Sequence, residues 1–115
     1  MNLLQSLFGP PMPSVNAAEL NEKLKNGKHP LVLDVRQPEE YRTGHINGAK
    51  LIPLGELGRR MNELPKDKEI VCVCATGNRS HSATKFLLNA GYNAVNMKGG
   101  MMMWARSGMS VRKGN

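Results

Sequence analysis

Short apolar runs alternate with helix-forming segments along this chain, and that alternation limits the possible folds more than any other feature. Four runs predict strands, at residues 31–35, 49–52, 70–73 and 93–97. The first and third are almost continuously apolar, which is typical of strands covered on both faces, as in a parallel sheet. Because helical patterns separate the strands, the sequence predicts an α/β sandwich around a mostly parallel sheet.

The segments between the strands have the signals of helices. Asn16 followed by Glu19 has the form of a capping box, and the helix that it begins is predicted to end at Gly27. Pro38 predicts a helical turn that reaches Arg42. The remaining helices are expected over residues 54–64, from about residue 80 to 91, and around residue 104.

A chain of 115 residues is long enough for one core and one domain. No stretch reaches the roughly 18 consecutive apolar residues that a membrane span needs, so we expect no membrane partner. Residues 1–18 lack the basic start and long apolar run of a secretory signal, and two cysteines are too few for a disulfide framework. We therefore expect a soluble protein of the reducing cytoplasm.

Charge is distributed unevenly along the chain. Residues 1–69 contain all 9 acidic residues and have a net charge of +1, whereas residues 70–115 contain six basic side chains and no acidic one. This half could attract an anion, although ordinary solubility would explain the same excess. Since the basic residues are not clustered and few aromatic residues lie between them, we expect no nucleic-acid partner.

One strand runs directly into a cysteine. Cys74 follows the apolar run 70–73 and begins the loop Ala75, Thr76, Gly77, Asn78, Arg79 and Ser80, after which a helix is predicted. The backbone N–H groups of such a loop and of the first helical turn favour negative charge, which lowers a cysteine pKa. Gly77 would allow a positive φ, and Arg79 would supply a fixed cation for an oxyanion. Cys74 is thus the candidate nucleophile, and a small packing residue is the alternative interpretation.

The second cysteine, Cys72, lies in the middle of the same run, where we expect it to pack in the core rather than to act as a resolving thiol. The histidines are scattered at positions 29, 45 and 81, and no second ligand pair accompanies the cysteines. The sequence therefore predicts no metal site.

Five short motifs follow one another in a fixed order. They are Asp34-Val-Arg-x-Pro-x-Glu-Tyr-x-x-Gly-His-Ile-x-Gly-Ala49, Ile52-Pro-Leu54, Cys74-x-x-Gly-x-Arg-Ser80, Gly91-Tyr92 and Lys98-Gly-Gly-x-x-x-Trp104. In this order and spacing they resemble a single rhodanese domain over residues 14–112. The resemblance implies a three-layer sandwich with a central five-stranded parallel sheet flanked by helices. Residues 1–13 would then be an N-terminal extension and residues 113–115 a C-terminal tail.

The same resemblance implies a sulfurtransferase in which Cys74 carries sulfur as a persulfide. Its thiolate would attack the sulfane sulfur of a small anionic donor, thiosulfate or a persulfide, and N–H groups of loop 75–80 would hold the persulfide anion. Cyanide, a thiol, or a thioredoxin-like or sulfur-relay protein would accept the sulfur, without a metal or organic cofactor. Ala75 and Thr76 are neutral where thiosulfate-preferring members often have basic residues, which leaves the donor open.

The other motif residues are expected to support the fold. Asp34 and Arg36 would order neighbouring backbone, and His45 would be a hydrogen-bonded structural residue. His81 would face solvent from the helix after the loop. Of the consecutive methionines at positions 101–103, one or two would pack in the core.

Three other functions compete with small-molecule sulfur transfer. A phosphatase or arsenate reductase also places a cysteine and an arginine around an oxyanion, but only four residues separate Cys74 from Arg79, one fewer than in cell-cycle phosphatases of rhodanese architecture. A non-catalytic binding module is disfavoured because Cys74 is present. Sulfur delivery to a protein partner shares the chemistry and remains open.

Overall fold

Five parallel strands form one sheet in the part of the chain that the structure describes, residues 11–27 and 29–115 of a computed structural model. Their order in the sheet is β1-β5-β4-β2-β3. The strands are β1 (Ser14–Val15), β2 (Leu31–Asp34), β3 (Lys50–Leu51), β4 (Ile70–Val73) and β5 (Ala94–Met97). The predicted α/β fold with a central five-stranded parallel sheet is confirmed. Most of the predicted N-terminal extension, residues 1–10, lies outside the described residues.

The central strand β4 positions the candidate cysteine. All four of its residues are buried, and it pairs with β2 on one side and β5 on the other. The register sets Cys72 opposite Leu33 of β2 and Asn96 of β5. Because all these strands are parallel, the residues that follow them, Cys74 among them, meet at one edge of the sheet.

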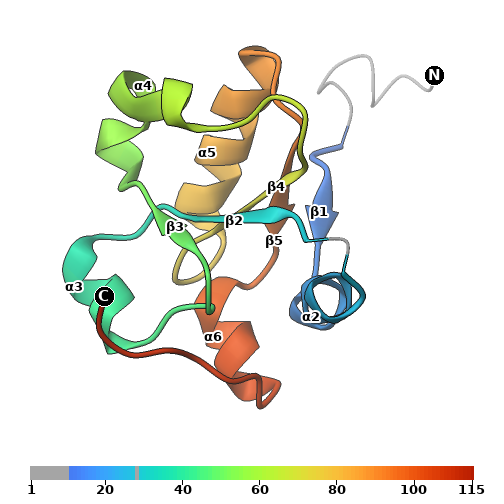
Figure 1. The fold of residues 1–115 in the computed structure, drawn as a ribbon, viewed down its shortest axis with the longest axis vertical. Helices are drawn as coiled ribbons and strands as arrows, with labels where there is room; N and C mark the ends of the chain where they lie inside the picture. The colour runs from blue at the N-terminus through green and yellow to red at the C-terminus, as the bar shows by residue number, and fades with distance from the viewer. Residues whose placement is uncertain (1–10, 28) are drawn as a thin grey trace.

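Helices cover both faces of the sheet, as Figure 1 shows. On one face lie α4 (Leu57–Arg60) and α5 (Asn78–Asn89), and on the other lie α2 (Ala17–Lys25) and α6 (Gly100–Arg106). Successive strand residues alternate between the two cores. Cys72 and Cys74 pack with Leu87 of α5, whereas Val73 packs with Trp104 of α6. The candidate nucleophile therefore belongs to the face covered by α5.

Two details differ from the sequence-based expectations. The prediction of a single helix over 54–64 is wrong. This range forms three short segments instead, which are the 3-10 helix Leu54–Glu56, α4, and the 3-10 helix Met61–Glu63. Gly55 and Gly58 lie within this stretch, and glycine disfavours a continuous helix. Strand β1 has only two residues, too few for a periodic pattern, and it exists through its pairing with β5.

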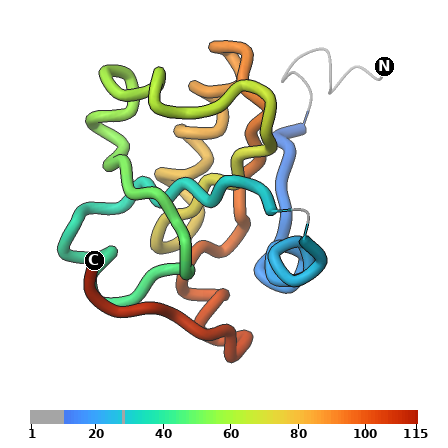
Figure 2. Tube along the Cα trace, in the orientation of Figure 1, coloured from blue at the N-terminus to red at the C-terminus, as the bar shows by residue number. Residues whose placement is uncertain are grey.

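The chain returns at its C-terminal end to α3 (Pro38–Thr43), as Figure 2 makes clear. The backbones of His45 and Arg112 exchange hydrogen bonds of 2.9 and 2.8 Å, and the Gly114 N–H donates to the Arg42 carbonyl. Among the described helices, none combines the length and the apolar character needed to cross a membrane.

Candidate active site

The loop after β4 turns sharply into α5, and glycine makes that turn possible. Gly77 precedes the first residue of α5 and has a φ of 103°, which side chains other than glycine rarely adopt. A Cβ atom at this position would also lie 3.2 Å from the backbone nitrogen of Gly99. The predicted positive φ at Gly77 is therefore present, and it folds the loop back over the end of β4.

The sulfur of Cys74 lies inside this turn and accepts hydrogen bonds from it. The Gly77 N–H donates to Sγ at 3.1 Å and the Ser80 N–H at 3.3 Å, while the Ser80 hydroxyl lies 3.3 Å away. The residue is only 1% exposed. These donors surround the sulfur on the side of the first turn of α5, where the helix dipole also favours a negative charge.

The protonation of Cys74 reflects two opposing effects. Burial alone would raise the pKa of this thiol. Hydrogen bonds from the Ser80 hydroxyl and from the backbone N–H groups of Ser80, Gly77 and Thr76 outweigh it, and the pKa lies below its usual value. The arrangement therefore favours a thiolate, which is the nucleophilic form of cysteine.

Cys72 has the opposite character, although its side chain points to the same face of β4. It is fully buried, and burial raises the pKa of its thiol to about 11. Both cysteines are free thiols. Cys72 is therefore a neutral packing residue near neutral pH, in agreement with its predicted role.

The backbone at the start of helix α6 binds the start of the loop, a contact that was not predicted from the sequence. The N–H groups of Met101 and Met102 donate to the carbonyl oxygens of Cys74 and Ala75 at 2.8 and 3.0 Å. Gly100, with a φ of 59°, lies so close that a Cβ atom there would be 2.5 Å from the Cys74 oxygen. The consecutive glycines at positions 99 and 100 were the available signal, since they permit such a close backbone approach.

Asn96 of β5 is a second supporting residue that the sequence did not reveal. Its side-chain amide nitrogen donates to the carbonyl oxygen of Gly77 at 3.3 Å. The same carbonyl accepts the His81 N–H at 3.1 Å. Asn96 thus helps to fix the position of Gly77, whose N–H contacts the sulfur. The available sequence signal was a polar residue within a predicted strand.

Arg79 is paired with a carboxylate that sequence reasoning did not connect to the loop. Its guanidinium group donates to both carboxylate oxygens of Glu40 in α3, at 2.7 and 2.8 Å. The hydrogen bonds from Arg79 lower the pKa of Glu40 to about 2. The positive charge expected at this end of the loop is therefore largely offset at neutral pH.

Asp34 and Arg36 form a buried ion pair at the end of β2. The Arg36 guanidinium group donates to the Asp34 carboxylate at 2.8 to 3.2 Å and to the carbonyl oxygens of Glu40 and Gly44 at 3.3 and 2.8 Å. The Asp34 carboxylate also accepts the Arg36 backbone N–H. The pair connects the end of β2 to the first turn of α3 and to Gly44, the residue that follows this helix.

His45, His81 and the methionines at positions 101–103 lie as predicted. His45 is buried, with Nδ1 2.9 Å from the Tyr41 carbonyl oxygen and its ring stacked on that of Tyr41. His81 is exposed on α5. Met101 packs in the core, whereas Met102 and Met103 are 45% and 39% exposed.

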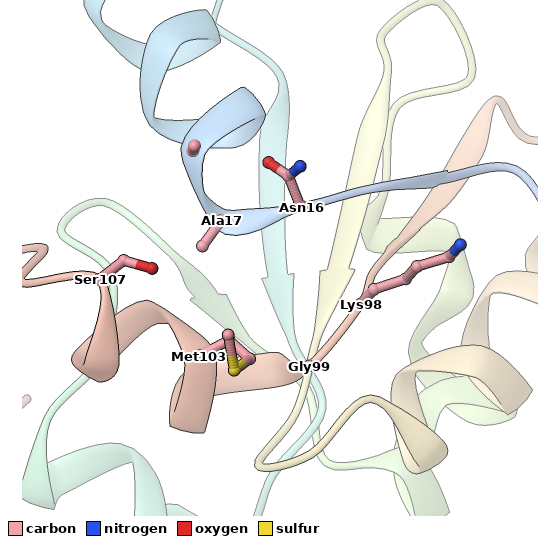
Figure 3. Close-up of a pocket in the computed structure, with 7 residues that line it drawn as sticks. Asn16, Ala17, Lys98, Gly99, Met103 and Ser107 are labelled. Atoms are coloured by element: carbon pink, nitrogen blue, oxygen red, sulfur yellow. The ribbon is translucent and has the colours of Figure 1, made fainter.

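Two hollows of similar size open on opposite sides of α6. One of about 410 Å³ adjoins the loop and is lined by Ala75 and Thr76 together with Arg36, Met101, Met102 and Val111. The other, of about 430 Å³, lies between α6 and the start of α2, where Met103 and Ser107 face Asn16 and Ala17 (Figure 3). The first hollow is the candidate substrate pocket, because its lining includes Ala75 and Thr76, which directly follow Cys74, whereas the lining of the second contains no residue of loop 75–80. No three His, Cys, Asp or Glu residues in the described part of the chain gather closely enough to hold a metal ion.

Comparison with known proteins agrees with this geometry. The family profile of the rhodanese-like domain matches residues 16–107. A sulfurtransferase from Allochromatium vinosum is 35% identical over 98 residues, which cover 84% of this chain and 92% of that protein. The crystal structure of a rhodanese-related protein from Thermoplasma volcanium matches with a TM-score of 0.82 and 40% identity, covering 87% of this chain and 97% of that one. A rhodanese-like domain protein from Staphylococcus aureus matches with a TM-score of 0.83 and 36% identity, covering 90% of this chain and 100% of the other.

Proposed function

Since this chain belongs to the rhodanese-like domain family, we propose that it is a sulfurtransferase in which Cys74 carries a sulfane sulfur from a donor to a thiophilic acceptor. The observation that carries the proposal is the environment of the Cys74 sulfur, which accepts backbone hydrogen bonds at 3.1 and 3.3 Å from Gly77 and Ser80. An anionic sulfur is stable there without a separate base. We propose residues 14–112 as the functional domain, acting in the reducing cytoplasm.

The reaction has two steps of thiol chemistry. The Cys74 thiolate attacks the outer sulfur of thiosulfate or of an organic persulfide, the sulfur–sulfur bond of the donor breaks, and sulfite or a thiol leaves. The enzyme is then Cys74–S–S⁻, with its charge on the terminal sulfur. Cyanide or a thiol attacks that sulfur, forms thiocyanate or a new persulfide, and regenerates the thiolate.

The loop would stabilise both sulfur anions. Hydrogen bonds from Gly77 and Ser80 favour the thiolate before the attack. We expect N–H groups of residues 75–80 to hold the terminal persulfide sulfur as well, in the manner of an oxyanion hole. Helix α6 contributes indirectly, because its hydrogen bonds to the Cys74 and Ala75 carbonyls orient the peptide units of the loop.

Phosphoryl or arsenate chemistry is less well supported. Such a reaction needs an arginine that holds the oxyanion, and the Arg79 guanidinium group is already engaged by both oxygens of Glu40. Transfer of sulfur to a thioredoxin-like or sulfur-relay protein is compatible with the same persulfide and changes only the acceptor.

Intact-mass measurement tests the proposal. The protein is incubated with thiosulfate, and separately with glutathione persulfide, and its mass is compared with that of the Cys74→Ser and Cys72→Ala variants. We expect a gain of one sulfur atom in the wild type and in Cys72→Ala, and no gain in Cys74→Ser, because Cys72 is buried and protonated. Cyanide should remove the added sulfur as thiocyanate.

Two results would overturn the proposal. One is the absence of a mass gain with either donor while the protein hydrolyses an aryl phosphate. The other is a mass gain that persists in Cys74→Ser and disappears in Cys72→Ala, which would show that Cys72 carries the sulfur instead of Cys74.

A further inference from the structure

The arginine of the loop after β4 is already paired with a carboxylate, which affects the charge of the donor that this site can bind. Arg79 and Glu40 are each 36% exposed in their side chains and form two charge-assisted hydrogen bonds, at 2.7 and 2.8 Å. To bind an anion through both arms of its guanidinium fork, Arg79 would have to give up Glu40. A donor with two negative charges would also approach the Glu40 carboxylate.

The second arginine of this region is engaged in the same way. Arg36 is the only charged residue among the described residues that line the hollow beside the loop. Its guanidinium group is held by Asp34 and by the carbonyl oxygens of Glu40 and Gly44, and the residue is 5% exposed. The two arginines are therefore matched by two carboxylates, and their charges offset one another.

Apart from Arg36, Thr43 and Thr76, the residues that line the hollow are apolar. Met101, Met102, Ala105 and Val111 line it beside Ala75 and Thr76 of the loop. Met102 and Val111 are large apolar side chains with exposures of 45% and 42%. A volume of about 410 Å³ lies in the range of pockets that take small organic molecules, roughly 300–1,000 Å³, and exceeds what a sulfur oxyanion needs.

We propose that the donor for this site is an organic persulfide whose apolar group occupies the hollow formed by Met101, Met102, Ala105 and Val111, and that Glu40 is a specificity-determining residue that disfavours dianionic donors such as thiosulfate. The inference rests on the proposed function of Cys74. In the transfer step the thiolate and R–S–SH give Cys74–S–S⁻ and R–SH, so the proton of the donor leaves with the thiol. The net charge of the site does not change in this step.

Two donors that differ in one substituent test the inference. Thiosulfate and benzenethiosulfonate both present a terminal sulfur bound to an oxidised sulfur, but benzenethiosulfonate has a phenyl ring in place of one charged oxygen. With cyanide as acceptor, kcat/KM is measured for both donors. We expect kcat/KM of the wild type to be higher for benzenethiosulfonate by at least roughly tenfold. The phenyl ring gains an apolar contact in the hollow, and this donor lacks the second negative charge that the Glu40 carboxylate would repel.

Matched variants separate the charge from the pocket. Glu40→Gln should raise kcat/KM for thiosulfate by roughly tenfold and change the aryl donor less, because Arg79 regains a free charge. Glu39→Gln, the same change at the adjacent exposed position, is the control and should leave both values unchanged. Met102→Ser should lower kcat/KM for the aryl donor by roughly tenfold. Met103→Ser, on the same helix but facing the other hollow, should not.

The outcomes distinguish this inference from the function on which it rests. If neither donor transfers sulfur to Cys74, the proposed function fails and the inference fails with it. If both donors load Cys74 equally well, the inferred donor class is wrong while the sulfurtransferase function stands. The same conclusion follows if kcat/KM does not differ between Glu40→Gln and its control Glu39→Gln, and does not differ between Met102→Ser and its control Met103→Ser.

Discussion

Gly100 of α6 lies against Cys74 so closely that a Cβ atom on Gly100 would be 2.5 Å from the Cys74 carbonyl oxygen. The next residue, Met101, donates its N–H to that oxygen at 2.8 Å. The carbonyl oxygen of the candidate nucleophile is therefore held by backbone from another helix, while the loop N–H groups hold its sulfur. This relationship gives the loop a rigid support without any side chain from α6.

Gly100→Ala should disrupt this support. We expect the free energy of unfolding to fall by about 2–4 kcal/mol, from roughly 1–3 kcal/mol for overpacking and roughly 1 kcal/mol for an alanine at positive φ. Urea denaturation measures the change, and sulfur loading of Cys74 should fall with it. Gly55→Ala is the control, because a Cβ atom there meets nothing within 4 Å, and its stability should match that of the wild type. Equal stability of Gly100→Ala and Gly55→Ala would contradict the close contact.

Ser80 should set the pH dependence of Cys74. The Cys74 pKa lies below its usual value because of hydrogen bonds that include one from the Ser80 hydroxyl. The alkylation rate of Cys74 should therefore begin to increase at a lower pH than that of an ordinary thiol. In a Cys72→Ala background, Ser80→Ala should raise this pKa and slow alkylation at pH 7 by roughly fivefold, the worth of one hydrogen bond of about 1 kcal/mol. Ser82→Ala, at an exposed position of α5, is the control.

The same shift predicts the sign of a stability effect. Because folding lowers the Cys74 pKa, the contribution of this thiol to stability should be absent below the folded pKa and grow as pH rises toward the ordinary value of 9.0. Cys74→Ser should remove that increase, and an unchanged slope of stability against pH would argue against a stabilised thiolate.

Asn96 should affect the thiolate more than the fold. Its amide nitrogen donates to the Gly77 carbonyl, which also accepts the His81 N–H, and the Asn96 Oδ1 atom is buried without a partner among the described residues. Asn96→Leu should therefore change stability by less than about 1 kcal/mol, because no acceptor on Gly77 is left unpaired. Alkylation of Cys74 should shift to higher pH as the Gly77 N–H loses its orientation. Asn93→Leu, at an exposed position before β5, should leave both measurements unchanged.

The buried pair of Asp34 and Arg36 should matter for stability. Asp34→Ala leaves a buried guanidinium group without its carboxylate, which should cost about 3–5 kcal/mol in urea denaturation. The double variant Asp34→Leu with Arg36→Met removes both charges and should be less destabilised than Asp34→Ala. Equal destabilisation of the double variant and of Asp34→Ala would contradict the cost of a buried guanidinium group without its carboxylate.

Local patterns predicted most of the fold. The run 70–73 is apolar throughout and became the buried strand β4, and the capping box of Asn16 and Glu19 begins α2 with both reciprocal hydrogen bonds. These signals work because they depend on neighbours in the chain. Strand β1 has no such signal, since Ser14 and Val15 are extended only because β5 lies beside them. The division of residues 54–64 into three short helical segments could not be predicted either, because the spacing of apolar residues is the same for one continuous helix and for the three short segments.

The group of residues at the end of β4 could be read from the sequence alone: a cysteine between an apolar run and a helix, a glycine at the turn, and an arginine beside it. These residues lie within six consecutive positions, so their proximity follows from covalent connection and local geometry. The contacts that hold the loop and shift the Cys74 pKa come from the folding of the whole chain. Glu40 reaches Arg79 across 39 positions, Asn96 reaches Gly77 across 19, and Met101 contacts the Cys74 carbonyl. Such pairs depend on strand order and register, which the packing of the whole sheet sets and no local pattern encodes.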